Sequence, residues 1–154
     1  MKLKIIDAAI AALQSSLTVA EEAAKQAKDL ATDEQSKAET QYDTVAIEAA
    51  FLAHGQSERV AQLKYQIAYW HDIQRKNIDS ELITAGSAFA LTCESGESKH
   101  YLMSDDSGGD KLVINGVTWY VVSRLSPIGK ACWDKSLDDD VSFQGIDWWV
   151  SEIF

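Results

Sequence analysis

Two patterns of hydrophobic and polar residues divide the chain near residue 80. In residues 1–80 the apolar side chains recur at alternating steps of four and three, the spacing of a helix that packs against another helix. In residues 81–154 short runs of β-branched and aromatic residues are separated by turn residues, which is typical of a sheet. The pattern predicts an α+β protein with two domains, residues 1–78 and residues 79–154.

An apolar seam runs along the first predicted helix, with large residues at its start and alanines at its end. Its members are Ile6, Ile10, Leu13, Leu17, Ala20, Ala24, Ala27 and Ala31. The second helix carries Tyr42, Val45, Ala49 and Leu52 and then, beyond a slip near residues 56–59, Val60, Leu63, Ile67 and Trp70. Two long helices joined by a polar segment predict an antiparallel coiled-coil hairpin with an acidic tip near residues 29–43. An ordinary helical bundle and a dimerising coiled coil remain as alternatives, because they show the same spacing.

Turn signals in the second half predict a small antiparallel sheet. Asn115 and Gly116 lie between two apolar runs, and this pair favours a hairpin turn with positive φ at both residues. The Ser-Gly-Gly segment at residues 107–109 predicts a second turn. Ser126 and Pro127 suit the N-cap and the first position of a short helix over residues 128–137. One short helix packed on a curved antiparallel sheet completes the predicted domain.

Composition and charge exclude several classes of protein. Among 154 residues, 24 Asp and Glu outnumber 14 Lys and Arg, which gives a net charge of −10. Such an acidic chain does not suit a protein that holds nucleic acid by neutralising phosphates. Cys93 and Cys132 lack the spacing of metal ligands and suit a reducing compartment. No apolar run approaches the roughly 20 residues of a membrane span, so we expect a cytoplasmic protein with no membrane partner.

Candidate catalytic residues are sparse. None of the three histidines pairs with another histidine or with a cysteine at ligand spacing, and no serine or cysteine lies in a G-x-S-x-G motif. We therefore expect a protein that has no active site, no stably bound metal and no cofactor of its own.

Two acidic clusters remain. Residues 138–140 (Asp-Asp-Asp) are best explained as a solvated turn, and the second cluster lies at the predicted hairpin tip: Asp29, Asp33, Glu34, Glu39 and Asp43. Carboxylates grouped in this way can hold Mg²⁺ weakly. Presented to the metal site of another enzyme, they would help to position a metal ion for phosphodiester hydrolysis. The simpler explanation is that these acids only keep a polar loop soluble.

The C-terminal half resembles the Gre-type transcription elongation factors, the GreA/GreB family. The most specific segment, residues 123–143, reads SRLSPIGKACWDKSLDDDVSF and is similar to the C-terminal signature of the family around its Ser-Pro pair. Residues 101–123, YLMSDDSGGDKLVINGVTWYVVS, resemble the strand-turn-strand pattern that precedes it. The predicted helical hairpin with an acidic tip is the N-terminal partner that this family has, so the resemblance covers nearly the whole chain.

The resemblance implies a fold, a partner and a mechanism. The C-terminal domain would be FKBP-like and would dock at the rim of the secondary channel of bacterial RNA polymerase, with Ser126 and Pro127 in the docking region. The hairpin would pass down this channel as part of a monomer. Its tip carboxylates, Glu39 with Glu34 or Asp33, would assist the Mg²⁺ of the polymerase active site in hydrolysing the 3′ end of backtracked RNA.

Two other functions stay open. The tip segment has Ser36 where the family has an aspartate, and this favours a regulator or inhibitor that binds the channel without stimulating cleavage. An adaptor protein that dimerises through the coiled coil is a third possibility, because the seam pattern alone does not distinguish a hairpin within one chain from a dimer.

Overall fold

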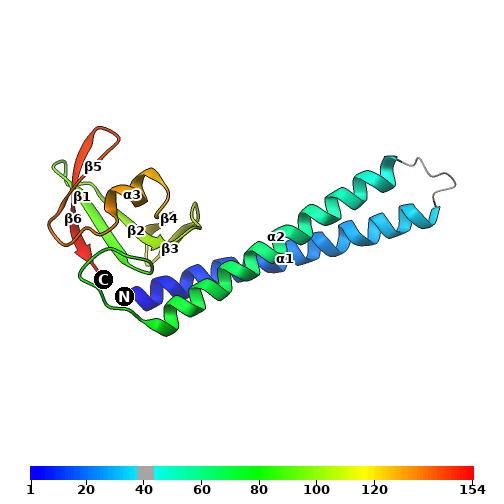
Figure 1. Cartoon of the computed structure of the whole chain (residues 1–154), viewed down its shortest axis with the longest axis horizontal. Coiled ribbons are helices and arrows are strands. Elements are labelled where there is room, and N and C mark those ends of the chain that lie inside the picture. Colours follow the sequence, from blue (N-terminus) through cyan, green and yellow to red (C-terminus); the bar gives the residue numbers. More distant parts are fainter. Residues whose placement is uncertain (38–43) are drawn as a thin grey trace. The chain divides into compact units, whose positions relative to one another are not determined.

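A computed structural model of the protein describes residues 1–37 and 44–154, without the side chains of residues 33–37. Two long helices, α1 (Lys2–Lys37) and α2 (Thr44–Lys76), are followed by a sheet and a short helix (Figure 1). The chain forms two compact units. One contains residues 11–68, and the other contains residues 1–10 together with residues 69–154.

The sheet contains six strands within the described residues, in the spatial order β3-β4-β2-β1-β6-β5. Their bounds, with that of the short helix, are β1 Ala88–Cys93, β2 Ser98–Ser104, β3 Lys111–Ile114, β4 Val117–Ser123, α3 Pro127–Cys132, β5 Asp140–Phe143 and β6 Ile146–Ile153. The α+β class, with a helical hairpin followed by a small sheet and one short helix, is therefore confirmed. The finer likeness to FKBP stays a prediction.

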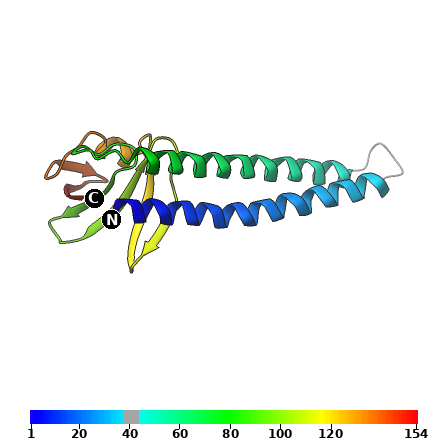
Figure 2. The same cartoon turned by 90° about the horizontal axis from the view of Figure 1, so that it is seen from below.

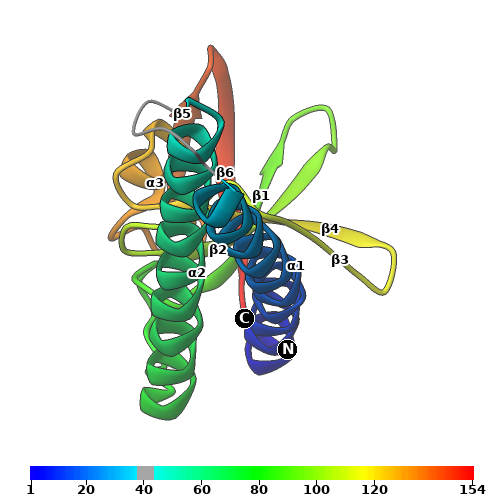
Figure 3. The same ribbon diagram turned by 90° about the vertical axis from the view of Figure 1, so that its right-hand side faces the viewer.

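One predicted feature of the sheet is wrong, because the sheet is mixed rather than antiparallel. Strands β2 and β4 pair in parallel, from His100 opposite Trp119 to Ser104 opposite Ser123, whereas the other four pairs are antiparallel. After β2 the chain crosses to the edge strand β3 and returns as β4 between β3 and β2. Residues 107–109 thus belong to the segment that connects β2 to β3. The β3–β4 hairpin projects from the β3 edge of the sheet (Figure 3).

The hairpin turn at Asn115 and Gly116 is confirmed. Their φ angles are 51° and 79°, as the predicted turn requires. A second turn with two positive φ angles, 54° at Gln144 and 75° at Gly145, joins β5 to β6. Glutamine is uncommon in this conformation, so the sequence carried little signal for this turn.

The main core of the sheet lies on the face that α3 covers. Its buried members are Ile83, Phe89, Leu91, Cys93, Tyr101, Met103, Ile128, Cys132, Val141, Trp148 and Val150. The Phe89 and Tyr101 rings stack with their centroids 5.4 Å apart. Strand β1 alternates its core residues Phe89, Leu91 and Cys93 with Ala88, Ala90 and Thr92, so the face that α3 covers receives the larger side chains of this strand.

In the helical hairpin, α1 and α2 run side by side (Figure 2), and Lys64 Nζ lies 3.8 Å from Glu21 Oε1 across the pair. The predicted α1 seam is confirmed, since all of its eight members are buried or half-buried. The α2 seam differs from the prediction. An unbroken alternation of three and four connects the buried or half-buried residues Ala46, Ala49, Ala53, Gln56, Val60, Leu63, Ile67 and Trp70; Gln66, Tyr69 and residues 72–74 are half-buried beside this row.

The predicted slip in α2 is therefore wrong, and two predicted seam residues lie outside the seam. Val45 is 52% exposed and Leu52 is 53% exposed. Alanines occupy the contact positions in their place, because two helices approach more closely over small side chains.

By length and composition, Lys2–Thr32 of α1 would suffice to cross a membrane. This finding differs from the expectation drawn from uninterrupted apolar runs. Core helices of soluble proteins and N-terminal signal sequences share the same property. In this protein the apolar residues of the helix include the buried seam residues Ile10 and Leu13.

Candidate functional site

The predicted metal-assisting residues lie at the far end of α1 or beyond it. Asp33 and Glu34 belong to the last two turns of α1, which ends at Lys37. Glu39 lies outside the described residues, as does Asp43. Among the residues that the structure describes, no three His, Cys, Asp or Glu side chains come together in a way that could hold a metal ion. The role of the tip carboxylates therefore stays a prediction.

The predicted docking residues begin α3 as the sequence indicated. Ser126 is the N-cap, and its Oγ accepts a hydrogen bond of 3.1 Å from the Gly129 backbone N–H. The same hydroxyl donates to the Ser123 carbonyl oxygen at 2.6 Å. Pro127 follows at the first helical position, where its missing N–H has no helical partner to lose. Ser126 therefore fixes the start of α3 against the end of β4.

Gly129 lets α3 lie directly on the end of β4. A Cβ atom at this position would be 1.9 Å from the Ser123 carbonyl oxygen, which is far inside van der Waals contact. The helix is also shorter than predicted, since it ends at Cys132 rather than at residue 137. Trp133 is extended, and Asp134 has a φ of 61°, so the chain leaves the helix at this point.

Two residues beside the docking pair were not recognised in the sequence as part of the site. Arg124 lies 3.8 Å from the Asp105 carboxylate, and its guanidinium lies 5.3 Å from the centre of the Trp133 ring. Leu125 is 61% exposed. Both residues fall within the Gre-like segment, but only the fold shows that one is held in place and the other is presented to solvent.

The loop after β2 is anchored to Tyr69 of α2, which belongs to the same compact unit as the sheet. The Asp105 backbone N–H donates to the Tyr69 hydroxyl at 3.0 Å, and that hydroxyl lies 3.5 Å from the Asp105 carboxylate. Burial raises the pKa of Tyr69, and the nearby carboxylates of Asp105 and Asp106 raise it further. The Tyr69 phenol thus remains protonated and keeps its hydrogen bonds with the loop.

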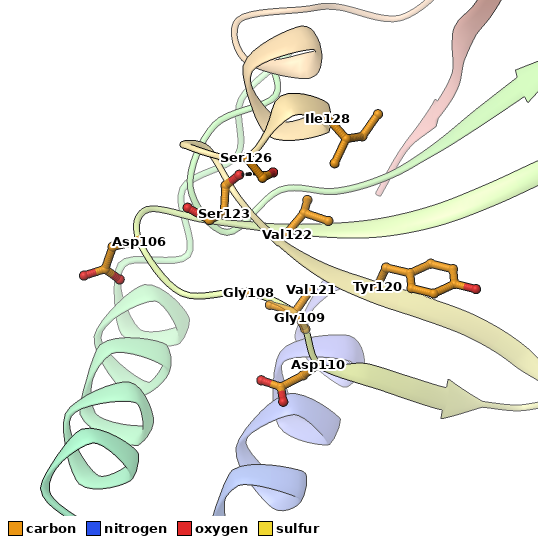
Figure 4. Close-up of a pocket in the computed structure, with 10 residues that line it drawn as sticks. All are labelled: Asp106, Gly108, Gly109, Asp110, Tyr120, Val121, Val122, Ser123, Ser126 and Ile128. Carbon is orange, nitrogen blue, oxygen red and sulfur yellow. Dashed lines mark hydrogen bonds between the residues drawn. The ribbon is translucent and has the colours of Figure 1, made fainter. Parts of the chain in front are cut away.

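A cavity of about 440 Å³ opens between this loop, β4 and the start of α3 (Figure 4). Its lining includes Asp106, Gly108, Gly109, Asp110, Tyr120, Val121, Val122, Ser123, Ser126 and Ile128. The predicted docking residue Ser126 is therefore part of a hollow surface. The sequence signal for this cavity is the Ser-Gly-Gly segment at residues 107–109, whose pattern predicts only a turn.

The two thiols have opposite environments. Burial raises the pKa of Cys132 to about 12. The Ser95 hydroxyl lies 3.0 Å from Cys93 Sγ and lowers the pKa of that thiol. Both cysteines are buried and free, and both belong to the main core of the sheet.

Asp138 and Asp139 lie in the segment before β5, close to the predicted turn, and Asp140 is the first residue of that strand. The Asp139 carboxylate accepts hydrogen bonds from the Ser136 N–H and hydroxyl at 2.7 and 2.9 Å. These hydrogen bonds lower the pKa of Asp139. These two hydrogen bonds within the turn explain why an acidic residue occupies position 139.

No protein-family model matches the sequence, and no characterised protein matches it in sequence. Solved structures similar to this chain include the GreA factor homolog 1 (Gfh1) of Thermus thermophilus, with 18% identity over 94% of each chain and a TM-score of 0.40. A structure described as the transcription factor Gfh1 has 18% identity over 95% of this chain and 93% of that one, with a TM-score of 0.37. Gfh1 of Thermus aquaticus has 18% identity over 96% of this chain and 94% of that one, with a TM-score of 0.39. These likenesses concern the course of the chain and do not identify its partner.

Proposed function

We propose that the protein is a Gre-like transcription factor that binds bacterial RNA polymerase in the cytoplasm. The sheet domain docks at the rim of the secondary channel, and the helical hairpin enters the channel. The observation that carries the proposal is the local structure of the Gre-like segment. Ser126 caps α3, which begins with Pro127, and its hydroxyl donates to the carbonyl of Ser123, the last residue of β4. The residues of the Gre-like segment around Ser126 thus form one ordered element.

The helical hairpin supports the same function. Helices of 36 and 33 residues each span about 50 Å at 1.5 Å per residue. Their seam keeps one heptad register through α2, which suits two helices that stay together along their length. Such a hairpin is long enough to carry residues at its tip into a channel of another protein.

The chemistry at the tip is proposed from the sequence. Glu39, with Asp33 or Glu34, would bind and orient the Mg²⁺ of the polymerase through carboxylate oxygens, the ligands that this ion prefers. That ion supplies an activated water for phosphodiester hydrolysis. On this proposal the protein stimulates the polymerase's own hydrolysis of backtracked RNA as a monomer, without an active site of its own.

A second function, a channel-binding regulator without cleavage activity, is favoured by one specific residue. Ser36 stands where the Gre-type tip has an aspartate. A serine hydroxyl is a weaker ligand for a hard divalent cation than a carboxylate. Such a protein would compete with cleavage factors for the channel.

The experiment that separates these functions uses a stalled, backtracked elongation complex with labelled RNA. We expect the purified protein to bind the complex and to release short 3′ RNA fragments. Glu39→Ala should abolish fragment release while binding persists. Glu48→Ala, which removes the same charge from an exposed position of α2, serves as the matched control and should release fragments normally.

Each other outcome has a definite meaning. Binding without fragment release identifies the non-cleaving regulator. Equal fragment release by Glu39→Ala excludes this residue from the tip chemistry. Absence of binding to the polymerase contradicts both functions.

A further inference from the structure

The cavity beside Ser126 has an apolar wall and an acidic mouth. Val122 and Ile128 project from β4 and α3, and Tyr120 extends along the strand (Figure 4). Asp106 and Asp110 lie at the two ends of the short segment that contains Gly108 and Gly109 (Figure 4). A volume of about 440 Å³ is within the range of pockets that hold a large side chain or a small ligand.

The segment that forms the mouth is held in place on both sides. The Ser107 N–H donates to Ser104 Oγ at 3.0 Å, which closes the turn after β2. The Gly109 N–H donates to the Val121 carbonyl at 2.9 Å, and the Val121 N–H donates to the Asp110 carbonyl at 2.9 Å. A Cβ atom on Gly108 would lie 2.7 Å from the Ser123 nitrogen, so this segment rests directly on β4. The cavity is therefore preformed, and a ligand would lose little free energy in ordering it.

The charges at the mouth are unbalanced. Asp105 pairs with Arg124 at 3.8 Å, but Asp106 and Asp110 are exposed and form no ion pair with any residue that the structure describes. The nearest cation in the sequence, Lys111, has its ammonium 5.9 Å from the centre of the Tyr120 ring. The two carboxylates lie at opposite ends of the segment, and Asp110 is at the end nearer Tyr120, whose ring already attracts a cation (Figure 4).

We propose that this cavity binds an arginine side chain carried by a segment of a protein partner. The guanidinium would pair with the Asp110 carboxylate, Asp106 would add negative charge at the other end of the mouth, and the methylene stem and a neighbouring apolar residue would lie against Val122, Ile128 and Tyr120. Arginine suits the site better than lysine, because its planar group pairs with carboxylates through two hydrogen bonds and stacks on aromatic rings.

The proposal deepens the proposed function and rests on it only for the identity of the partner, which would be the polymerase. The surface contains Ser126, so an arginine held in the cavity would lie next to the docking pair. Complementary charge would also speed the encounter of this acidic domain with a basic segment.

The test uses the full-length, ¹⁵N-labelled protein and the peptide acetyl-Ala-Leu-Arg-Leu-Ala-amide, followed by NMR. We expect saturable shifts of the amide signals of residues 106–110, 120–123 and 126. The same peptide with citrulline in place of arginine has nearly the same shape without the charge, and it should bind at least tenfold more weakly. The double variant Asp106→Asn, Asp110→Asn should weaken binding of the arginine peptide by a similar factor.

Asp147→Asn is the matched control, because it removes one negative charge from an exposed position elsewhere in the same sheet. It should bind the arginine peptide as the wild type does. Three results would overturn the site: equal binding of the citrulline peptide, equal weakening by Asp147→Asn, or shifts spread over other acidic surfaces. The NMR spectrum of each variant also shows whether it is folded.

The same variants separate the site from the proposed function. If the wild type binds the polymerase but not the arginine peptide, the cavity is not an arginine site and the proposed function stands. If the double variant loses the peptide yet binds the polymerase with unchanged affinity, the polymerase does not fill this cavity. Peptide binding without any polymerase binding would leave the site intact and refute the proposed function.

Discussion

The sheet-bearing unit and the helical unit differ in which apolar residues they bury. In the sheet-bearing unit Phe89, Leu91 and Val150 are fully buried. In the helical unit the buried positions include Ala27 and Ala49, whereas Phe51 is 73% exposed and Val19 is 69% exposed. The first unit is therefore stabilised by burial of many large side chains, whereas the second, apart from the buried Leu13 and Leu63, is stabilised by contact of two helices over small side chains.

This difference has an energetic consequence. Each buried alanine removes far less apolar surface from water than a buried phenylalanine or leucine, and the stabilisation scales with that surface at about 25 cal/mol per Å². The contact between α1 and α2 in residues 11–68 is thus weak for its length. The large side chains on the outer surface of this unit contribute little to its stability.

The same substitution made in both units tests this comparison with the largest expected effect. Phe89→Ala should lower the free energy of unfolding by about 3–5 kcal/mol, because it leaves a cavity in the core. Phe51→Ala should change it by less than about 0.5 kcal/mol. Urea unfolding followed by tryptophan fluorescence reports on the sheet-bearing unit, which contains all five tryptophans. Circular dichroism reports on the helices. Similar losses in the two variants would contradict the comparison.

A buried thiol should make the sheet-bearing unit sensitive to alkaline pH. The pKa of Cys132 is raised to about 12, so the unfolded thiol loses its proton first as pH increases above about 8.5. Below that pH the Cys132 thiol makes its full contribution to the free energy of unfolding. Above it, this contribution declines by at most about 1.4 kcal/mol per pH unit until the pKa of the folded state is reached. Between pH 8 and pH 10.5 the free energy of unfolding should therefore decrease by about 2–3 kcal/mol less in Cys132→Ala than in the wild type.

The slope with pH is the readout for this variant, because the missing sulfur also lowers stability at every pH. Burial is the main cause that raises the pKa of Tyr101 to about 12, and this burial effect is common to both proteins; the smaller contribution of Cys132 to that pKa is lost with the thiol. Cys93→Ala is the control. The Ser95 hydroxyl lowers the pKa of the Cys93 thiol, so removal of that thiol should not lessen the alkaline loss. Parallel pH profiles of Cys132→Ala and the wild type would refute the assignment.

Two glycines in helices should respond to alanine with opposite signs. Gly129→Ala places a Cβ atom 1.9 Å from the Ser123 carbonyl oxygen and should cost about 1–3 kcal/mol through overpacking. Gly55 lies within α2 with nothing within 4 Å of a Cβ atom. Gly55→Ala should stabilise the helical unit by about 0.5–1 kcal/mol. Thermal unfolding measures both changes, and a stabilising Gly129→Ala would show that α3 does not lie against β4.

Two serines give the smallest of these effects. Ser126→Ala removes the N-cap hydrogen bond to the Gly129 N–H and should cost about 1 kcal/mol. Ser57 instead donates within α2 to the Ala53 carbonyl at 2.9 Å, a contact that stabilises a helix little. Ser57→Ala should be neutral or slightly stabilising. Equal losses from the two variants, measured by urea unfolding, would contradict the cap assignment at Ser126.

The sequence predicted the elements of this protein better than their contacts. The seam of α1, the Asn115–Gly116 turn and the Ser126 cap were predictable, because each depends on local spacing or on one residue's conformational preference. The α2 seam was misplaced because Val45 and Leu52 were favoured over Ala46 and Ala53, although helices can pack closely over alanines. The parallel pairing of β2 and β4 was missed because it depends on the path between distant strands.

The candidate site shows the same limit. Ser126 and Pro127 were found from their local motif, but the cavity beside them needs Gly108 and Gly109 to cross β4 after leaving β2. The cavity can therefore be predicted only when the order of the strands in the sheet is known. The tip residue Glu39 lies outside the described residues, so its role rests on the sequence.

We propose that this protein docks on bacterial RNA polymerase through the segment at Ser126 and Pro127. Fluorescence anisotropy of the labelled, full-length protein titrated with core polymerase tests it most directly. We expect saturable binding of one protein per polymerase, weakened several-fold by Pro127→Ala while the variant remains folded. An absence of saturable binding, or equal affinity of the wild type and Pro127→Ala, would contradict the claim.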